Sequence, residues 1–346
     1  METEGADSPR RGGTRRRQVT GREEAEAGTL RTQQLHAQGR LGEAVEEGLL
    51  TLTAWRALGD SRRECELLLW LVWALSDQGA SAEALLLARH AFDAARAARL
   101  PSELERSLVA VAGLQGRLGD AAAAETLLLQ ALSRARELPD AQQVPVPLNA
   151  LLATLLQAHE DQRETDPERA LATAARLQRH ARDALRWASQ EPDAMRKAIL
   201  LSNAGAALGV AGQPQEGIQR LRESLQLAEE SGLRLVALRA AERLSGQLLH
   251  AGSVEQALAL DPVLQEQLRP DDGPAVRESV HTARARLAEA RGDAELAASM
   301  REAANRDRAE RLAGAEAMRD AVSRLAGGVL RVLPEVDLEW AQRPGG

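Results

Sequence analysis

A turn glycine that recurs every 40 residues is the feature that most constrains how this chain folds. The glycines form two series, Gly39, Gly79 and Gly119, followed by Gly212, Gly252 and Gly292. Five residues after each comes a small residue, which is Gly217 after Gly212 and alanine after the other five. Small residues let two helices approach closely beyond the turn. A fixed period of this length therefore predicts a solenoid built from helix pairs.

The composition favours helices over sheets. Hydrophobic residues make up 44% of the 346 residues, whereas aromatic residues make up only 2%, with no tyrosine and a single phenylalanine. A core of leucine and alanine suits closely packed helices, because both residues have high helix propensity and low strand propensity. We therefore expect an all-α fold: a right-handed superhelical solenoid of about seven antiparallel helix pairs with a long C-terminal capping helix.

The chain divides into three segments. Residues 1–22 are rich in proline, glycine and arginine and lack apolar periodicity, which predicts a disordered basic tail. Residues 23–310 hold the repeat array. Residues 311–346 comprise the end of the capping helix and a short tail.

Two of the second helices carry specific expectations about where they end. In the sixth unit, one second helix is expected to run as far as Arg269, directly before Pro270. In the last unit, the second helix begins at Asp293 and no helix breaker follows until the glycine pair at 327–328, so it is expected to continue to about Leu325 and to stop at that pair.

The small and apolar residues of the units follow an ordered pattern. In the fifth unit they are Leu201, Gly205, Leu208, Gly217 and Ser224. The matching positions hold Val72, Leu75, Ala84 and Ala91 in the second unit, and Ala112, Ala124 and Ala131 in the third. This pattern resembles the tetratricopeptide repeat family. The usual aromatic residues are missing, and the period exceeds the family's ~34 residues, so the chain is most similar to the long-unit repeat domains attached to bacterial signalling proteins.

The resemblance implies a non-enzymatic scaffold or adaptor in the bacterial cytoplasm that binds a protein or peptide in a concave groove lined by the first helix of each unit. An alternative is a regulatory or sensory module that acts through its C-terminal helix, either on itself as a homodimer or on a separate output protein. The apolar seam of that helix would include Leu312, Met318, Val322 and Leu325.

Alignment of the units on their turns predicts the residues that face the groove. They are Trp70, Trp73, Arg106, Arg117, Asn149, Asn203, Arg239, Arg243 and Arg286. Asn203 falls at the position where the family holds a peptide backbone, and an amide can both donate and accept hydrogen bonds. Arginine can bind a carboxylate through two hydrogen bonds, and tryptophan offers a flat apolar anchor. Alternatively, the two tryptophans belong to the core between units, and the arginines only solvate the surface.

Signals for other functions are weak. The six histidines lack the i, i+3 or i+4 spacing of metal ligands, so no metal or cofactor is expected. GVAGQPQ at 209–215 lacks the GK[ST] ending of a phosphate loop. Cys65, the single cysteine, is expected to be a buried structural thiol. The net charge of −7 argues against nucleic acid as a partner, and no apolar run is long enough to span a membrane.

Overall fold

The computed structural model describes residues 21–37, 40–77, 80–117, 120–137 and 144–329. These residues form helices and turns, with no strand among them. The first eight helices are α1 (Arg22–Ala37), α2 (Leu41–Ala57), α3 (Ser61–Asp77), α4 (Ser81–Ala97), α5 (Pro101–Arg117), α6 (Ala121–Glu137), α7 (Pro145–Gln162) and α8 (Pro167–Ala188). The others are α9 (Ala194–Val210), α10 (Pro214–Glu230), α11 (Arg234–His250), α12 (Val254–Leu258), α13 (Asp261–Gln267), α14 (Pro274–Arg291) and α15 (Ala294–Val329).

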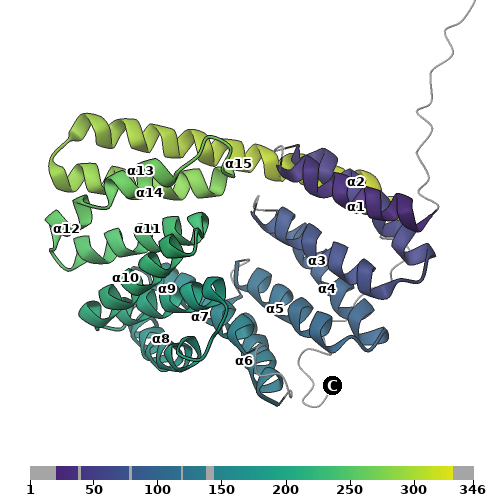
Figure 1. The fold of residues 1–346 in the computed structure, drawn as a ribbon, viewed down its shortest axis with the longest axis horizontal. Helices are drawn as coiled ribbons and strands as arrows, with labels where there is room; N and C mark the ends of the chain where they lie inside the picture. Colours follow the sequence, from purple (N-terminus) through teal and green to yellow (C-terminus); the bar gives the residue numbers. More distant parts are fainter. Residues whose placement is uncertain (1–20, 38–39, 78–79, 118–119, 138–143, 330–346) are drawn as a thin grey trace, which may run out of the picture.

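The helices are arranged as seven consecutive pairs, as the sequence predicts. Each first helix packs against its own second helix and against the neighbouring pairs, and the last pair is α14 with α15. The pairs follow one another around a curve (Figure 1). The molecule is therefore an all-α helical-repeat solenoid.

The solenoid closes on itself, which the sequence does not predict. The 36-residue helix α15 spans roughly 54 Å at 1.5 Å per residue. It packs against α14 and also against α2 in the first pair, whereas the other extensive contacts between described helices join the same or adjoining pairs. Figure 1 shows α15 running from the last pair to α1 and α2, so the array forms a ring. The capping helix thus packs against both the last and the first helix pair of its own chain.

Glycine in the left-handed region ends the first helix of several pairs. Gly212, Gly252 and Gly292 have φ of 78°, 73° and 78°. In each turn the residue after the glycine donates its backbone N–H back to the last turn of the helix, as Gln213 does to Leu208 O at 2.9 Å. Turn glycines at these positions are confirmed, while Gly39, Gly79 and Gly119 lie outside the described residues.

The predicted small residues bring the two helices of the fifth pair into backbone contact. A Cβ atom built on Gly217 would lie 2.6 Å from Gly205 O, and one built on Gly205 would lie 2.9 Å from Gly217 O. Ser224, about two turns further along α10, is fully buried and donates its hydroxyl to Ala198 O at 2.7 Å. The side chain of Gln247 from α11 fills the remaining space and donates to Gly205 O at 3.0 Å.

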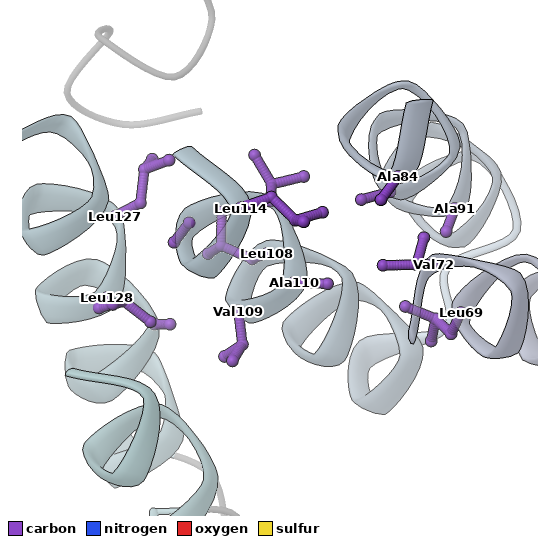
Figure 2. Packing of buried hydrophobic residues seen from close by; sticks show 14 of the residues in the cluster. Leu69, Val72, Ala84, Ala91, Leu108, Val109, Ala110, Leu114, Leu127 and Leu128 are labelled. Carbon is purple, nitrogen blue, oxygen red and sulfur yellow. The ribbon is translucent and has the colours of Figure 1, made fainter. Parts of the chain in front are cut away.

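Alanine serves the same purpose in the second and third pairs. Ala84 and Ala91 of α4 are completely buried. Figure 2 shows both residues beside Leu69 and Val72 of α3. With a methyl group on one helix and a leucine or valine on the other, the core fills with few aromatic side chains, of which Trp55 and Phe92 are buried, and this fits the aromatic content of only 2%.

Two predicted helix boundaries are wrong. The second helix of the sixth pair is not continuous to Arg269, because it divides into α12 and α13. Pro262 lies in the first turn of α13, where its missing N–H removes the hydrogen bond that would continue α12. The glycine pair 327–328 does not stop the last helix, since α15 continues to Val329. Glycine weakens a helix interior by only about 1 kcal/mol, which is insufficient to end it.

Gly217→Ala is predicted to destabilise the protein by about 1–3 kcal/mol, because the added methyl group collides with backbone atoms that cannot rotate away. Urea unfolding followed by circular dichroism measures the change. Gly246→Ala is the matched control, since a Cβ atom there meets nothing within 4 Å in the interior of α11. The control should be neutral or stabilising. An equal loss of unfolding free energy in Gly217→Ala and Gly246→Ala would contradict the close contact between α9 and α10.

A charge in the predicted apolar seam of α15 should open the ring. If the predicted seam is the surface that α15 presents to α2, the double variant Val322→Asp, Leu325→Asp is expected to increase the radius of gyration in small-angle X-ray scattering while the helical circular dichroism stays within a few per cent, because carboxylates are costly to bury between helices. Leu312→Asp is the control, since Leu312 was predicted in the same seam but is 52% exposed near the middle of α15. An unchanged radius in the double variant would contradict a seam made by these residues.

Candidate binding groove

The inside of the ring contains a groove with two connected lobes. The first lobe, of about 920 Å³, is lined by α3, α5, α7, α9 and α11. The second, of about 990 Å³, is lined by α7, α9, α11, α14 and Arg311 of α15. Both lobes share Leu156, Glu160, Ala206, Arg239, Glu242 and Arg243. The two lobes therefore form one continuous surface, the concave groove, made by first helices from the second pair onward.

The first lobe is mostly apolar and lies across the ring. Trp73 of α3 lines it and is 50% exposed. Leu235 of α11 also lines it and is 49% exposed, although α11 belongs to the sixth pair. Glycine and alanine residues of α5 and α7 line the space between them. The lobe is therefore wide, and its width depends on the curvature that brings the second and sixth pairs to face each other.

A polar network joins three successive first helices at the junction of the lobes. Asn203 of α9 donates its Nδ2–H to Asn149 Oδ1 of α7 at 3.0 Å. Arg243 of α11 donates Nη1–H to Asn203 Oδ1 at 2.6 Å and to Ser202 Oγ at 3.0 Å. Asn203 is only 6% exposed. Buried amides need such partners, so the network fixes these side chains relative to one another.

The direction of the hydrogen bonds determines what the groove offers a ligand. A guanidinium can only donate, so the atom of Asn203 that faces Arg243 must be oxygen. The Asn203 nitrogen then faces Asn149, and the Asn149 oxygen accepts. This arrangement leaves the Nε and Nη2 groups of Arg243, which lines both lobes, without a hydrogen bond to the described residues, while Asn149 supports the network without lining either lobe. The network therefore presents donors to the groove and suits a ligand rich in acceptors.

Arg243 is the cation of this network, and its hydrogen-bond partners are neutral. Burial lowers the pKa of its guanidinium from the ordinary value, and the nearby Glu242 carboxylate partly opposes that effect. An arginine remains protonated even so. A partly buried positive charge that donates to a hydroxyl and an amide, with an unused edge toward a groove, is well placed to bind a carboxylate through two hydrogen bonds.

The carboxylates that line the groove are already paired with arginines. Three carboxylates line it among the described residues. Glu160 Oε1 lies 3.3 Å from Arg163 Nη2, and Glu242 Oε2 lies 3.3 Å from Arg239 Nη1. Glu278 Oε2 lies 2.8 Å from Arg311 Nε. The remaining lining arginines are Arg243 and the exposed Arg286, neither of which has an ion pair within the described chain. The groove is thus locally basic in a protein whose net charge is −7.

The predicted groove residues divide into two groups. Six of them line the groove or join its network: Trp73, Asn203, Arg239, Arg243 and Arg286 line it, and Asn149 joins the network. Trp70 instead packs against the core and meets His36 edge-on, with ring centroids 5.2 Å apart. Arg106 is exposed on α5 and lines neither lobe. The side chains of Arg117, Met318, Val322 and Leu325 lie outside the described residues.

Sequence reasoning missed several lining residues. Leu235 and Glu242 lie on the same face of α11 as Arg239, and Ser202 precedes Asn203. The signal for the first two was their spacing of one helical turn from Arg239. Nothing in the sequence marks Ser202, because its role depends on an arginine 41 residues later in the chain.

Other reactive groups are part of the structure rather than of a second site. Cys65 is completely buried, and burial raises the pKa of its thiol to about 12. Burial also lowers the pKa of His90 to about 4. No group of histidine, cysteine and carboxylate side chains in the described chain has the arrangement of a metal site. None of the helices in the described ranges combines the length and the apolar character needed to cross a membrane.

Comparison with known proteins adds little to this description. No family model matches the sequence, and no curated protein matches it. Among solved structures, the chain is similar to BtubC (BKLC) from P. vanneervenii, with 19% sequence identity and a TM-score of 0.46 over 65% of this chain and 89% of that chain. The fold assignment rests on the packing of the chain's own helices.

The contact between Asn203 and Arg243 should be measurable as a coupling energy. We expect a double-mutant cycle of Asn203→Ala and Arg243→Ala in urea unfolding to give about 1–2 kcal/mol, because a charge-assisted hydrogen bond in a partly buried site is lost in either single variant. A parallel cycle of Asn203→Ala with Arg286→Ala is the control and should be additive within about 0.5 kcal/mol. Additivity in the first cycle would show that the bond contributes nothing to stability.

Proposed function

We propose that this protein is a non-enzymatic scaffold or adaptor of the bacterial cytoplasm, and that it binds an extended segment of a protein or peptide in the concave groove. The observation that carries this proposal is the network of Asn149, Asn203 and Arg243, which links three successive units and leaves donor groups of Arg243 unused where that residue lines both lobes. A repeated polar contact along first helices suits a ligand that runs along several units. The resemblance to tetratricopeptide repeats supports the same function.

The groove defines the chemistry of its ligand. The unused edge of Arg243, which lines both lobes, is suited to a carboxylate or to a backbone carbonyl. Trp73 and Leu235 supply apolar contact on either side of the first lobe. A peptide that combines apolar residues with at least one acidic residue therefore fits best.

The C-terminal helix supports a second candidate, a regulatory module of bacterial signalling. In that function α15 would leave α2 and pair with a second copy or with a separate output protein. The contact with α2 favours this candidate, because it provides a closed state from which α15 could be released. The same contact also opposes this function, because α15 must lose its packing against α2 before it can pair with another chain.

Selection from a random peptide library displayed on phage tests the groove. Peptides recovered on the wild-type chain are expected to contain Asp or Glu, and to bind the Arg243→Glu variant at least tenfold more weakly in fluorescence polarisation, because the substitution replaces attraction by repulsion. Arg179→Glu is the matched control, since Arg179 is exposed on α8 and lines neither lobe. Circular dichroism verifies that both variants are folded. Peptides that bind all three chains equally would place the site outside the groove.

A further inference from the structure

The sequence beyond α15 has the composition that the groove requires. Residues 333–340 read LPEVDLEW. From residue 335 onward, acidic and apolar residues alternate: Glu335, Val336, Asp337, Leu338, Glu339 and Trp340. These residues lie outside the described part of the chain. They form an acidic and apolar segment within a chain that contains a groove suited to that chemistry.

Alternation gives such a segment two distinct faces when it is extended. Successive side chains of an extended chain point to opposite sides, so the three carboxylates share one side, and Val336, Leu338 and Trp340 share the other. A ligand of this kind needs a groove with one basic wall and one apolar wall. A helical ligand would not separate the two kinds of residue in this way.

The concave groove has those two walls. Arg239 and Arg243 lie on α11, and Arg286 follows on α14. The wall formed by α3, α5, α7 and α9 carries Trp73, Val109, Leu156 and Ile199. Each carboxylate on the groove surface is paired with an arginine, as described above. The local excess of arginine is therefore available to an acidic segment.

The spacing of the charges also matches. Arg239 and Arg243 are four residues apart on one helix, which is about 6 Å along its axis. Carboxylates two residues apart on an extended chain are about 6.6 Å apart. Two successive acidic residues can therefore face Arg239 and Arg243 with the chain extended along α11. Arg239 keeps only an exposed ion pair with Glu242 and a hydrogen bond to Ser279, which compete weakly.

The segment can reach the groove from the place where α15 leads. Helix α15 packs against α2, and α2 packs against α3, whose Trp73 and Ser76 line the first lobe. Residues 330–340 span as much as about 36 Å when extended, at ~3.3 Å per residue. A distance of one or two helix diameters, each about 10 Å, is within that reach.

We propose that residues 333–340 bind in the concave groove of their own chain, with their acidic side toward Arg239 and Arg243 and their apolar side toward Trp73. This inference rests on the proposed function and adds a regulation to it: the chain carries its own competitor, and an external ligand must displace it. The other segment outside the array, residues 1–20, is a poorer occupant, because its arginines would repel the unpaired Arg243 and Arg286.

Tethering makes even a weak contact effective. A short flexible link gives an effective concentration on the order of 1 mM. If the free segment binds with a Kd of about 10 μM, the tethered copy weakens an external competitor about a hundredfold. The groove would then be selective for ligands that carry the same alternation and bind more tightly.

The test uses the full chain and a fluorescein-labelled peptide of residues 330–346. A tail-disabled chain carries Glu335→Arg, Asp337→Arg and Glu339→Arg. The peptide, which keeps the native sequence, is expected to bind the tail-disabled chain and to bind wild type at least tenfold more weakly in fluorescence polarisation. Adding Arg243→Glu to the tail-disabled chain should abolish binding, whereas adding the matched control Arg179→Glu should leave it unchanged.

Three results would overturn the proposal. They are equal binding of the peptide to wild-type and tail-disabled chains, absence of binding to the tail-disabled chain, and binding that survives Arg243→Glu. A dimer of the wild type in size-exclusion chromatography with light scattering, lost in the tail-disabled chain, would assign the segment to the groove of a second copy and would also overturn binding within one chain.

A library-selected peptide separates this proposal from the proposed function. If such a peptide binds the tail-disabled chain in an Arg243-dependent manner while the peptide of residues 330–346 does not, the groove binds ligands and only the internal occupant is wrong. If neither peptide depends on Arg243, both proposals are wrong.

Discussion

The contact between α15 and α2 is the constraint on which the shape of the molecule depends. In an open solenoid each unit touches only its neighbours, so small rotations accumulate and the curvature is soft. Here the last helix returns to the first pair and fixes the sum of those rotations. The groove is sensitive to that sum, because Trp73 and Leu235 line the same lobe from the second and sixth pairs. The width of the binding surface is therefore set by a contact that lies outside it.

The second feature that determines the shape of the groove is the scarcity of large side chains. Gly205 and Gly217 bring their helices into backbone contact, and completely buried alanines pack between the helices of the second pair. Small residues also line the groove, where Gly113 has no atom within 4 Å of a Cβ position. The same composition thus makes the pairs thin and leaves the inside of the ring open. In this space the few large groups, Trp73 and the arginines, dominate what a ligand can contact.

The sequence predicts those features whose causes are local. Gly212 needs a left-handed turn, and that requirement is visible in the chain as a period. The break between α12 and α13 was also readable, since Pro262 lies within the expected helix. Ring closure could not be predicted from the sequence, because it depends on rotations summed over seven pairs. The partners of Asn203 were equally hidden, since Asn149 and Arg243 lie 54 and 40 residues away along the chain. Alignment of the units placed all three residues near the groove, but only packing reveals that they bond to one another.

Closure and occupation of the groove meet in one element, because α15 both holds the ring and leads into residues 330–346. If the segment binds the groove, its link to α15 shortens the path it must search while α15 remains on α2. Release of α15 would lengthen that path and loosen the groove at the same time. By linkage, a ligand that displaces the segment must favour the released state of α15 by the same factor that release favours the ligand. Under these proposals the two candidate functions would describe one equilibrium, in which displacement of the segment by an external ligand and release of α15 from α2 favour each other.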